Sequence, residues 1–114
     1  MPKDNELNEA LEAALDKKAR DLVVIDVAEI CSFADNLVIC TGTSNRHNQT
    51  IAEGIEEHLR GLNVRPLHIE GQTQAEWILM DYSDFIVHIF SPKTRTYYNL
   101  ERLWRDAPRT EISD

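Results

Sequence analysis

The sequence predicts an α/β (α+β) protein in which a mixed β-sheet of about five strands is flanked by helices. Two short, largely apolar runs rich in β-branched residues indicate strands in the first half of the chain, between two stretches with apolar residues at helical spacing. In the second half, two apolar runs separated by three residues predict an antiparallel hairpin. In chain order, these patterns give α-β-β-α-β-β-β-α.

The first half of the chain contains two predicted helices and two predicted strands. Apolar residues at helical spacing predict a helix over Glu6–Ala19. The run Leu22–Val27 is typical of a strand that is covered on both faces, and Asn36–Thr41 predicts a second strand. Ser44 is suited to cap the second helix, which we expect to end at about Leu62, where turn-forming residues follow.

The second half contains three predicted strands and one helix. We expect a strand over Val64–Ile69 to lie at or near a sheet edge, because Pro66 lacks the N–H that a central strand needs. The runs Trp77–Asp81 and Phe85–Phe90 predict the hairpin. Ser91 followed by proline predicts the start of the last helix, since serine caps and proline suits the first turn.

Length and charge limit the organisation and the partners. The 114 residues fit one domain, which we expect to span residues 1–107 before a polar tail over residues 108–114. Twenty acidic against twelve basic residues give a net charge of −8. We therefore expect a basic partner and no primary nucleic-acid binding. Since the sequence has neither a membrane-length apolar run nor a signal region, we expect a cytoplasmic protein without direct membrane contact.

The turn Gly42–Ser44 leaves an enzymatic alternative open. A strand that ends in such a turn before a helix can present backbone N–H groups to a phosphate, as in a nucleotidyltransferase-like, nucleotide-binding enzyme. That chemistry also needs paired carboxylates for Mg²⁺, and the nearest candidates are Asp81 and Asp84, which are three positions apart across a turn. A structural turn is therefore the favoured interpretation. Neither the histidines nor Cys31 and Cys40 show metal-ligand spacing, and no local pattern selects a catalytic triad. We therefore expect no metal, cofactor or catalytic residue.

The predicted hairpin is the most informative segment for function. Alternation places Trp77, Leu79 and Asp81 on one face of the first strand, and both faces of the hairpin are largely apolar. Helices could cover both faces. Alternatively, part of one face stays exposed as a protein-recognition patch, in which aromatic residues are surrounded by acidic ones.

Several separate motifs resemble one known family. They are Asp35–Ser44, Glu70–Gly71, the stretch from Trp77 to Phe90, and Arg95 together with Tyr98–Trp104. On these motifs the chain resembles the ribosomal silencing factor family, also called Iojap-like proteins, from about residue 19 to residue 107. It departs from the usual pattern at Ser83, where the family has glycine in the hairpin turn.

The resemblance implies a nucleotidyltransferase-like topology without transferase chemistry, and a homodimer in isolation. It also implies binding to the large ribosomal subunit through ribosomal protein uL14, at the surface where the small subunit docks. A protein of this kind blocks the joining of the subunits, lowers translation when nutrients are scarce and assists late assembly of the large subunit. It would be a translational repressor and not an enzyme.

The resemblance and the hairpin together give the candidate binding residues. We expect Trp77 to anchor the partner and the acidic residues to meet its Lys or Arg side chains. The expected partner-binding residues are Trp77, Asp81, Tyr82, Asp84, His88, Glu70, Arg95 and Tyr98. A general dimeric adaptor with other partners is a third hypothesis, since the apolar hairpin alone would support it.

Overall fold

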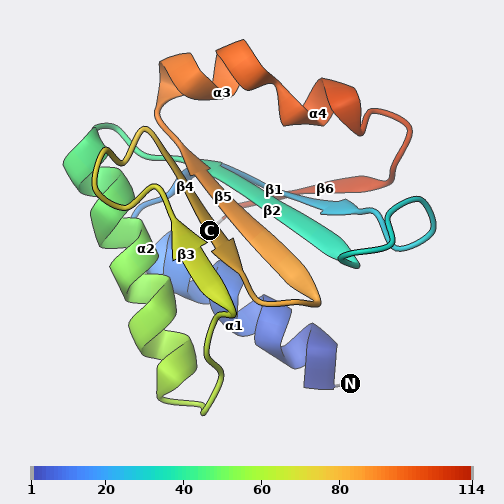
Figure 1. The fold of residues 1–114 in the computed structure, drawn as a ribbon, viewed down its shortest axis with the longest axis horizontal. Coiled ribbons are helices and arrows are strands. Elements are labelled where there is room, and N and C mark those ends of the chain that lie inside the picture. Colours follow the sequence, from blue (N-terminus) through green and yellow to red (C-terminus); the bar gives the residue numbers. More distant parts are fainter. Residues whose placement is uncertain (1, 114) are drawn as a thin grey trace.

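The fold is built on one six-stranded mixed sheet (Figure 1). The computed structural model describes residues 2–113, and the side chains of residues 5–113. The strands are β1 (Arg20–Asp26), β2 (Asn36–Thr41), β3 (His68–Glu70), β4 (Trp77–Asp81), β5 (Phe85–Phe90) and β6 (Arg109–Ile112). Their order in the sheet is β3-β4-β5-β2-β1-β6. The β2–β5 pair is parallel and the other four pairs are antiparallel.

Helices lie on both faces of this sheet (Figure 1). The helices are α1 (Pro2–Asp16), α2 (Asn45–Arg60), α3 (Pro92–Tyr98) and α4 (Leu100–Leu103). Helices α1 and α2 cover one face, and α3 and α4 cover part of the other. Two apolar cores result, one on each face. The predicted α+β class with a mixed sheet is confirmed, with six strands where about five were expected. No helix within residues 2–113 is long and apolar enough to cross a membrane.

Local chemistry explains the regular elements of the first half. Ser44 has extended backbone angles, and its Oγ accepts a hydrogen bond from the His47 N–H at 3.0 Å, as predicted for the cap of α2. On the inner face of α2, Ile51, Ile55 and Leu59 are fully buried against the sheet and α1. Such burial, worth roughly 2 kcal/mol per large aliphatic side chain, accounts for most of the stability of a helix of this length.

The segment expected to be a polar tail is largely a strand, so that prediction is wrong. Residues Arg109–Ile112 form β6, which pairs antiparallel with β1 and places Ile112 opposite Leu22. Three of the four residues in β6 are exposed, which is why the sequence there resembles a tail. Polar and charged side chains are suited to an edge strand because they discourage pairing with other chains.

Two other elements are shorter than expected. The strand predicted over Val64–Ile69 is reduced to β3, and it lies at the sheet edge, as the proline at position 66 requires. The last helix is divided at Asn99, whose backbone is left-handed (φ 44°, ψ 60°). Asn99 thereby ends α3 and begins α4, and its side chain accepts from the Arg102 N–H at 3.4 Å. Asparagine tolerates this conformation better than most residues do.

Candidate functional site

The β3–β4–β5 side of the sheet presents one face that α3 and α4 cover only in part. In an antiparallel pair, directly opposed side chains point to the same face. Leu79 is paired with Glu70 on one side and with His88 on the other, while Trp77 is opposite Phe90. These side chains therefore share one face, as alternation predicted. On the opposite face of β4, the side chains are buried against α2 and its core.

Aromatic rings gather on this face around Trp77. The centroid of the Trp77 ring lies 4.6 Å from that of Tyr98 and 5.1 Å from that of Phe90. Its indole Nε1–H donates a hydrogen bond to His88 Nδ1 at 3.0 Å. Trp77 is half-buried, while Tyr98, at the end of α3, is 49% exposed. We call these four residues the Trp77 cluster. Its two residues on β5, His88 and Phe90, are buried, whereas Tyr98 is accessible to a partner.

His88 is the rigid base of the Trp77 cluster. It is 7% exposed, and burial lowers its pKa to about 4. Because Nδ1 accepts from the indole N–H, the ring is neutral with its hydrogen on Nε2. Protonation would place a second donor against the indole N–H. His88 therefore orients Trp77 and has little surface to offer a partner.

An acidic edge lies beside the Trp77 cluster on the same face. His68 and Asp81 are directly paired between β3 and β4, and His68 Nδ1 lies 3.8 Å from Asp81 Oδ2. His68 Nε2 lies 2.9 Å from Glu70 Oε2. The Glu70 side chain is 68% exposed, and Asp81 Oδ1 accepts from the Ser83 N–H at 2.8 Å. Two carboxylates are thus presented at the sheet edge, and Asp81 is held by the hairpin turn.

Two of the expected binding residues lie away from this face. Tyr82 is 6% exposed, stacks on Phe85 with ring centroids 5.1 Å apart, and belongs to the core beneath α1 and α2. Burial, reinforced by the charge of Glu56, raises its pKa. Asp84 lies in the hairpin turn, where its backbone carbonyl accepts from the N–H groups of Asp35 and Asn36. Tyr82 therefore supports the hairpin from the core on the opposite face, and Asp84 supports it from the turn.

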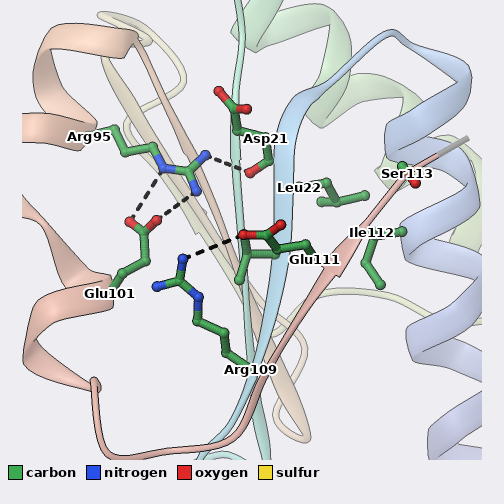
Figure 2. Close-up of a pocket in the computed structure, with 9 residues that line it drawn as sticks. Asp21, Leu22, Arg95, Glu101, Arg109, Glu111, Ile112 and Ser113 are labelled. Carbon is green, nitrogen blue, oxygen red and sulfur yellow. Dashed lines mark hydrogen bonds and ion pairs between the residues drawn. The ribbon is translucent and has the colours of Figure 1, made fainter.

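Arg95 faces a different part of the molecule (Figure 2). Its guanidinium donates to the Asp21 carbonyl at 2.7 Å and to Thr41 Oγ1 at 2.9 Å. It also forms an ion pair with Glu101 at 2.9 Å, and the two side chains are only 13% and 18% exposed. Arg95 and Glu101 border a polar cavity of about 660 Å³ that lies between α3, α4 and the β1–β6 edge. Arg109 also lines this cavity. Arg95 therefore ties both short helices to the sheet.

The turn after β2 uses its own polar groups internally. The Gly42 N–H donates to the Phe90 carbonyl at 3.1 Å, and the Thr43 N–H donates to His47 Nδ1 at 2.8 Å. Ser44 is engaged in capping α2. These hydrogen bonds favour the structural interpretation of the turn over a phosphate-binding one.

The carboxylates considered for nucleotide chemistry lie far from that turn. Gly42 follows the end of β2 that pairs with Phe90, whereas Asp81 and Asp84 lie at the opposite end of β5. Within the described part of the chain, no group of three His, Cys, Asp or Glu side chains could hold a metal ion. Burial raises the pKa of the neighbouring Cys40 thiol to about 12, so it is protonated at neutral pH.

Comparison with known proteins adds to this geometry. The model of the family described as "Ribosomal silencing factor during starvation" matches residues 2–114. The chain belongs to the ribosomal silencing factor family. The family resemblance drawn from the motifs is therefore confirmed, and the family is not a known class of enzyme.

Other members of the ribosomal silencing factor family show how far the likeness extends. The chain is 39% identical to ribosomal silencing factor RsfS of Halalkalibacterium halodurans over 103 residues, which cover 90% of this chain and 88% of that one. A crystal structure of a Chromobacterium violaceum protein superposes with a TM-score of 0.89 at 29% identity, covering 100% of this chain and 95% of the other. A mouse protein named "Mitochondrial assembly of ribosomal large subunit protein 1" is 33% identical over 91 residues, which are 77% of this chain and 40% of the mouse protein.

In this member of the ribosomal silencing factor family, the structure separates the expected binding residues by location. Trp77, His88 and Tyr98 meet in one cluster, and Glu70 and Asp81 lie on the same face. Leu79 and His68 also share this face, although they were not among the residues expected to bind. Period-two alternation and cross-strand pairing are the signals that would have found them.

Proposed function

We propose that this protein binds the large ribosomal subunit through ribosomal protein uL14 and, by occupying that surface, prevents the small subunit from joining. No bond is made or broken in this mechanism, so the protein acts as a translational repressor without catalysis. The observation that carries the proposal is the partly covered face where Trp77 and Tyr98 adjoin the acidic edge. Family membership supports it, as does the name of the mouse relative.

The electrostatics of the chain fit a basic ribosomal protein. With a net charge of −8, the chain attracts a positively charged partner, and complementary potentials increase the association rate and fix orientation. A steric repressor must stay bound longer than the interval between subunit encounters. Differences in affinity between related complexes lie mostly in the dissociation rate. An aromatic anchor that loses its water on binding, such as an indole, is therefore expected to slow dissociation most.

Within this proposal the expected binding residues have two roles. Trp77 and Tyr98 contact the partner, and Glu70 and Asp81 pair with its cationic side chains. The other four residues support these contacts. His88 lies beneath Trp77, and Tyr82 and Asp84 hold the hairpin turn. Arg95 fastens α3 to the sheet. We further propose a cytoplasmic homodimer in isolation, with an added role in late assembly of the large subunit.

Subunit joining tests the proposal directly. Purified small and large subunits are mixed with increasing amounts of the protein and separated on a sucrose gradient. We expect joined ribosomes to decrease as the protein saturates the large subunit, and the protein to sediment with the large subunit alone. Undiminished joining at saturating protein would refute the steric mechanism.

Replacing the anchor should weaken this binding. We expect Trp77→Ala to reduce affinity for the large subunit and for purified uL14 by about 30-fold, or roughly 2 kcal/mol, because a central aromatic anchor is lost. Binding is measured by cosedimentation and by calorimetry, on variants whose circular dichroism matches that of the wild type.

A matched control exists at the other end of the sheet. Phe33, in the loop between β1 and β2, is 62% exposed, so Phe33→Ala also removes an exposed aromatic ring. We expect this variant to bind as the wild type does. Equal loss of binding in both variants, or in neither, would remove Trp77 from the interface.

A further inference from the structure

The α3–α4 side of the molecule carries charge of the opposite sign to the rest. Between Pro92 and Arg109 the chain has five of its twelve Lys and Arg residues but two of its twenty acidic residues. That segment therefore carries +3, and the remainder of the chain carries −11. The overall charge of −8 conceals this difference. The acidic composition alone led to the expectation of no primary nucleic-acid binding.

The cations of this segment are mostly available to a partner. Arg95 is used internally by Glu101 and the backbone of Asp21. By contrast, Lys93, Arg102 and Arg105 are exposed. Figure 1 shows α3 and α4 as a separate outer layer on their side of the sheet, away from the acidic helices α1 and α2. Salt limits the reach of the remote acidic charges, since the Debye length is about 8 Å at physiological ionic strength.

Exposed aromatic and apolar side chains lie among these cations. Tyr97 is 80% exposed and Leu103 is 71% exposed, both large values for side chains of this size. The Tyr97 ring meets the Tyr98 ring edge to face, with centroids 5.1 Å apart, which gives it a fixed support. A hollow of about 560 Å³ lies along the two helices. Its lining includes both tyrosines, Leu103, the two cations Arg102 and Arg105, and one carboxylate, Asp106.

We propose that this hollow binds single-stranded RNA, with a base stacked on Tyr97 and the adjoining phosphates held by Arg102 and Arg105. An accessible aromatic ring next to arginines is the combination that unpaired RNA requires, because every base has a face to stack and every linkage has a phosphate. An acidic peptide would use the arginines but would leave the tyrosine without a role. The observations therefore favour RNA over an acidic protein segment.

The RNA contact is separate from the protein contact and adjoins it. Tyr98 contacts Trp77 on one side and Tyr97 on the other, so the two surfaces meet at that residue. A partner that presents a basic protein beside an unpaired RNA loop would engage both at once. The acidic edge would then face protein, and the α3–α4 surface would face RNA.

Fluorescence anisotropy with a fluorescein-labelled oligouridine of about twelve nucleotides tests the proposal, because that length exceeds a minimal stacking site. We expect the wild type to bind and to weaken as salt rises. The double variant Arg102→Glu with Arg105→Glu should weaken binding at least 10-fold, and Tyr97→Ala about 5-fold or more. The matched control is Arg60→Glu with Arg65→Glu, which makes the same change of net charge at two exposed arginines at and beyond the end of α2, outside the α3–α4 segment.

The outcomes are distinguishable from those of the proposed function. Absence of RNA binding by the wild type, or equal weakening by both double variants, would overturn the RNA site. Loss of affinity of Arg102→Glu/Arg105→Glu for purified uL14 to the same degree as for RNA would identify the surface as a protein contact, and would also overturn it. RNA binding that requires Arg102 and Arg105, together with unhindered subunit joining, would support the RNA site and refute the steric repressor.

Discussion

Removing the Arg95 guanidinium is expected to lower the free energy of unfolding by about 3 kcal/mol, because it leaves a partly buried carboxylate without its partner. In Arg95→Ala, Glu101 loses its ion pair, and the Asp21 carbonyl and Thr41 Oγ1 lose their donor. Urea unfolding followed by circular dichroism measures the change. Arg95→Lys should recover only part of it, since an ammonium group cannot reproduce the fork of hydrogen bonds.

Arg109 provides the control for this prediction within the same cavity (Figure 2). Its side chain is 44% exposed, and its ion pair with Glu111 is 3.7 Å long. Arg109→Ala should therefore change stability by no more than about 0.5 kcal/mol. If the two alanine variants were equally stable, Arg95 would not be the residue that fastens α3 and α4 to the sheet.

This prediction also separates two possible roles of Arg95. If Arg95 contacts the partner directly, its substitution would weaken binding even in protein that is still folded. A positioning residue acts through Tyr98 and Tyr97 on α3, so its loss would be felt mainly as lower stability. Below the unfolding transition, we expect the folded fraction of Arg95→Lys to bind purified uL14 within about threefold of the wild type, less than 1 kcal/mol.

Elements set by nearby residues were predictable from the sequence. The strand at Asn36–Thr41 has the predicted bounds, and Ser44 caps α2 as expected. The hairpin of β4 and β5 follows from two apolar runs and a three-residue connection. In each case the determining interactions lie within a few positions of one another, so pattern and capping chemistry are sufficient.

Features set by distant residues were not predictable in this way. The strand β6 is polar and exists because β1 offers it a backbone edge, so nothing within Arg109–Ile112 itself indicates a strand. Arg95 and the Asp21 carbonyl are 74 positions apart, and only the packing of α3 on the sheet brings them together. The candidate site was therefore predictable as a hairpin face, whereas the division of the expected residues into exposed and buried ones required the three-dimensional structure.

The charge distribution illustrates a different limit, that of a total taken over the whole chain. Net charge is a sum over the sequence, and the expectation of a basic partner rests on that sum. It gives no weight to where the charges lie. The fold pairs β3 with β4 and so brings the carboxylates of Glu70 and Asp81 to one edge, whereas the cations of α3 and α4 are already close together in the sequence. One small acidic domain can thus offer surfaces of opposite sign on either side of the Trp77 cluster.

The buried imidazole of His88 should make the stability of this protein depend on pH. Burial lowers its pKa from the ordinary 6.5 to about 4, so the unfolded chain takes up the proton first as pH falls. The stabilising effect of a neutral His88 is complete above the unfolded pKa and is lost as pH falls towards the folded one. Between about pH 7 and about pH 4, this single group should remove about 3 kcal/mol.

Comparison with His88→Asn isolates this contribution, because an asparagine oxygen can still accept from the Trp77 indole but does not titrate. Carboxylates that titrate in the same range affect both proteins alike and cancel in the difference. We expect the wild type to lose about 3 kcal/mol more than the variant between about pH 7 and about pH 4 in urea unfolding. Parallel stability curves for wild type and His88→Asn would show that His88 protonates as easily in the fold as outside it. Trp77 would then be held by packing on Phe90 and Tyr98, with no need of a neutral acceptor beneath it.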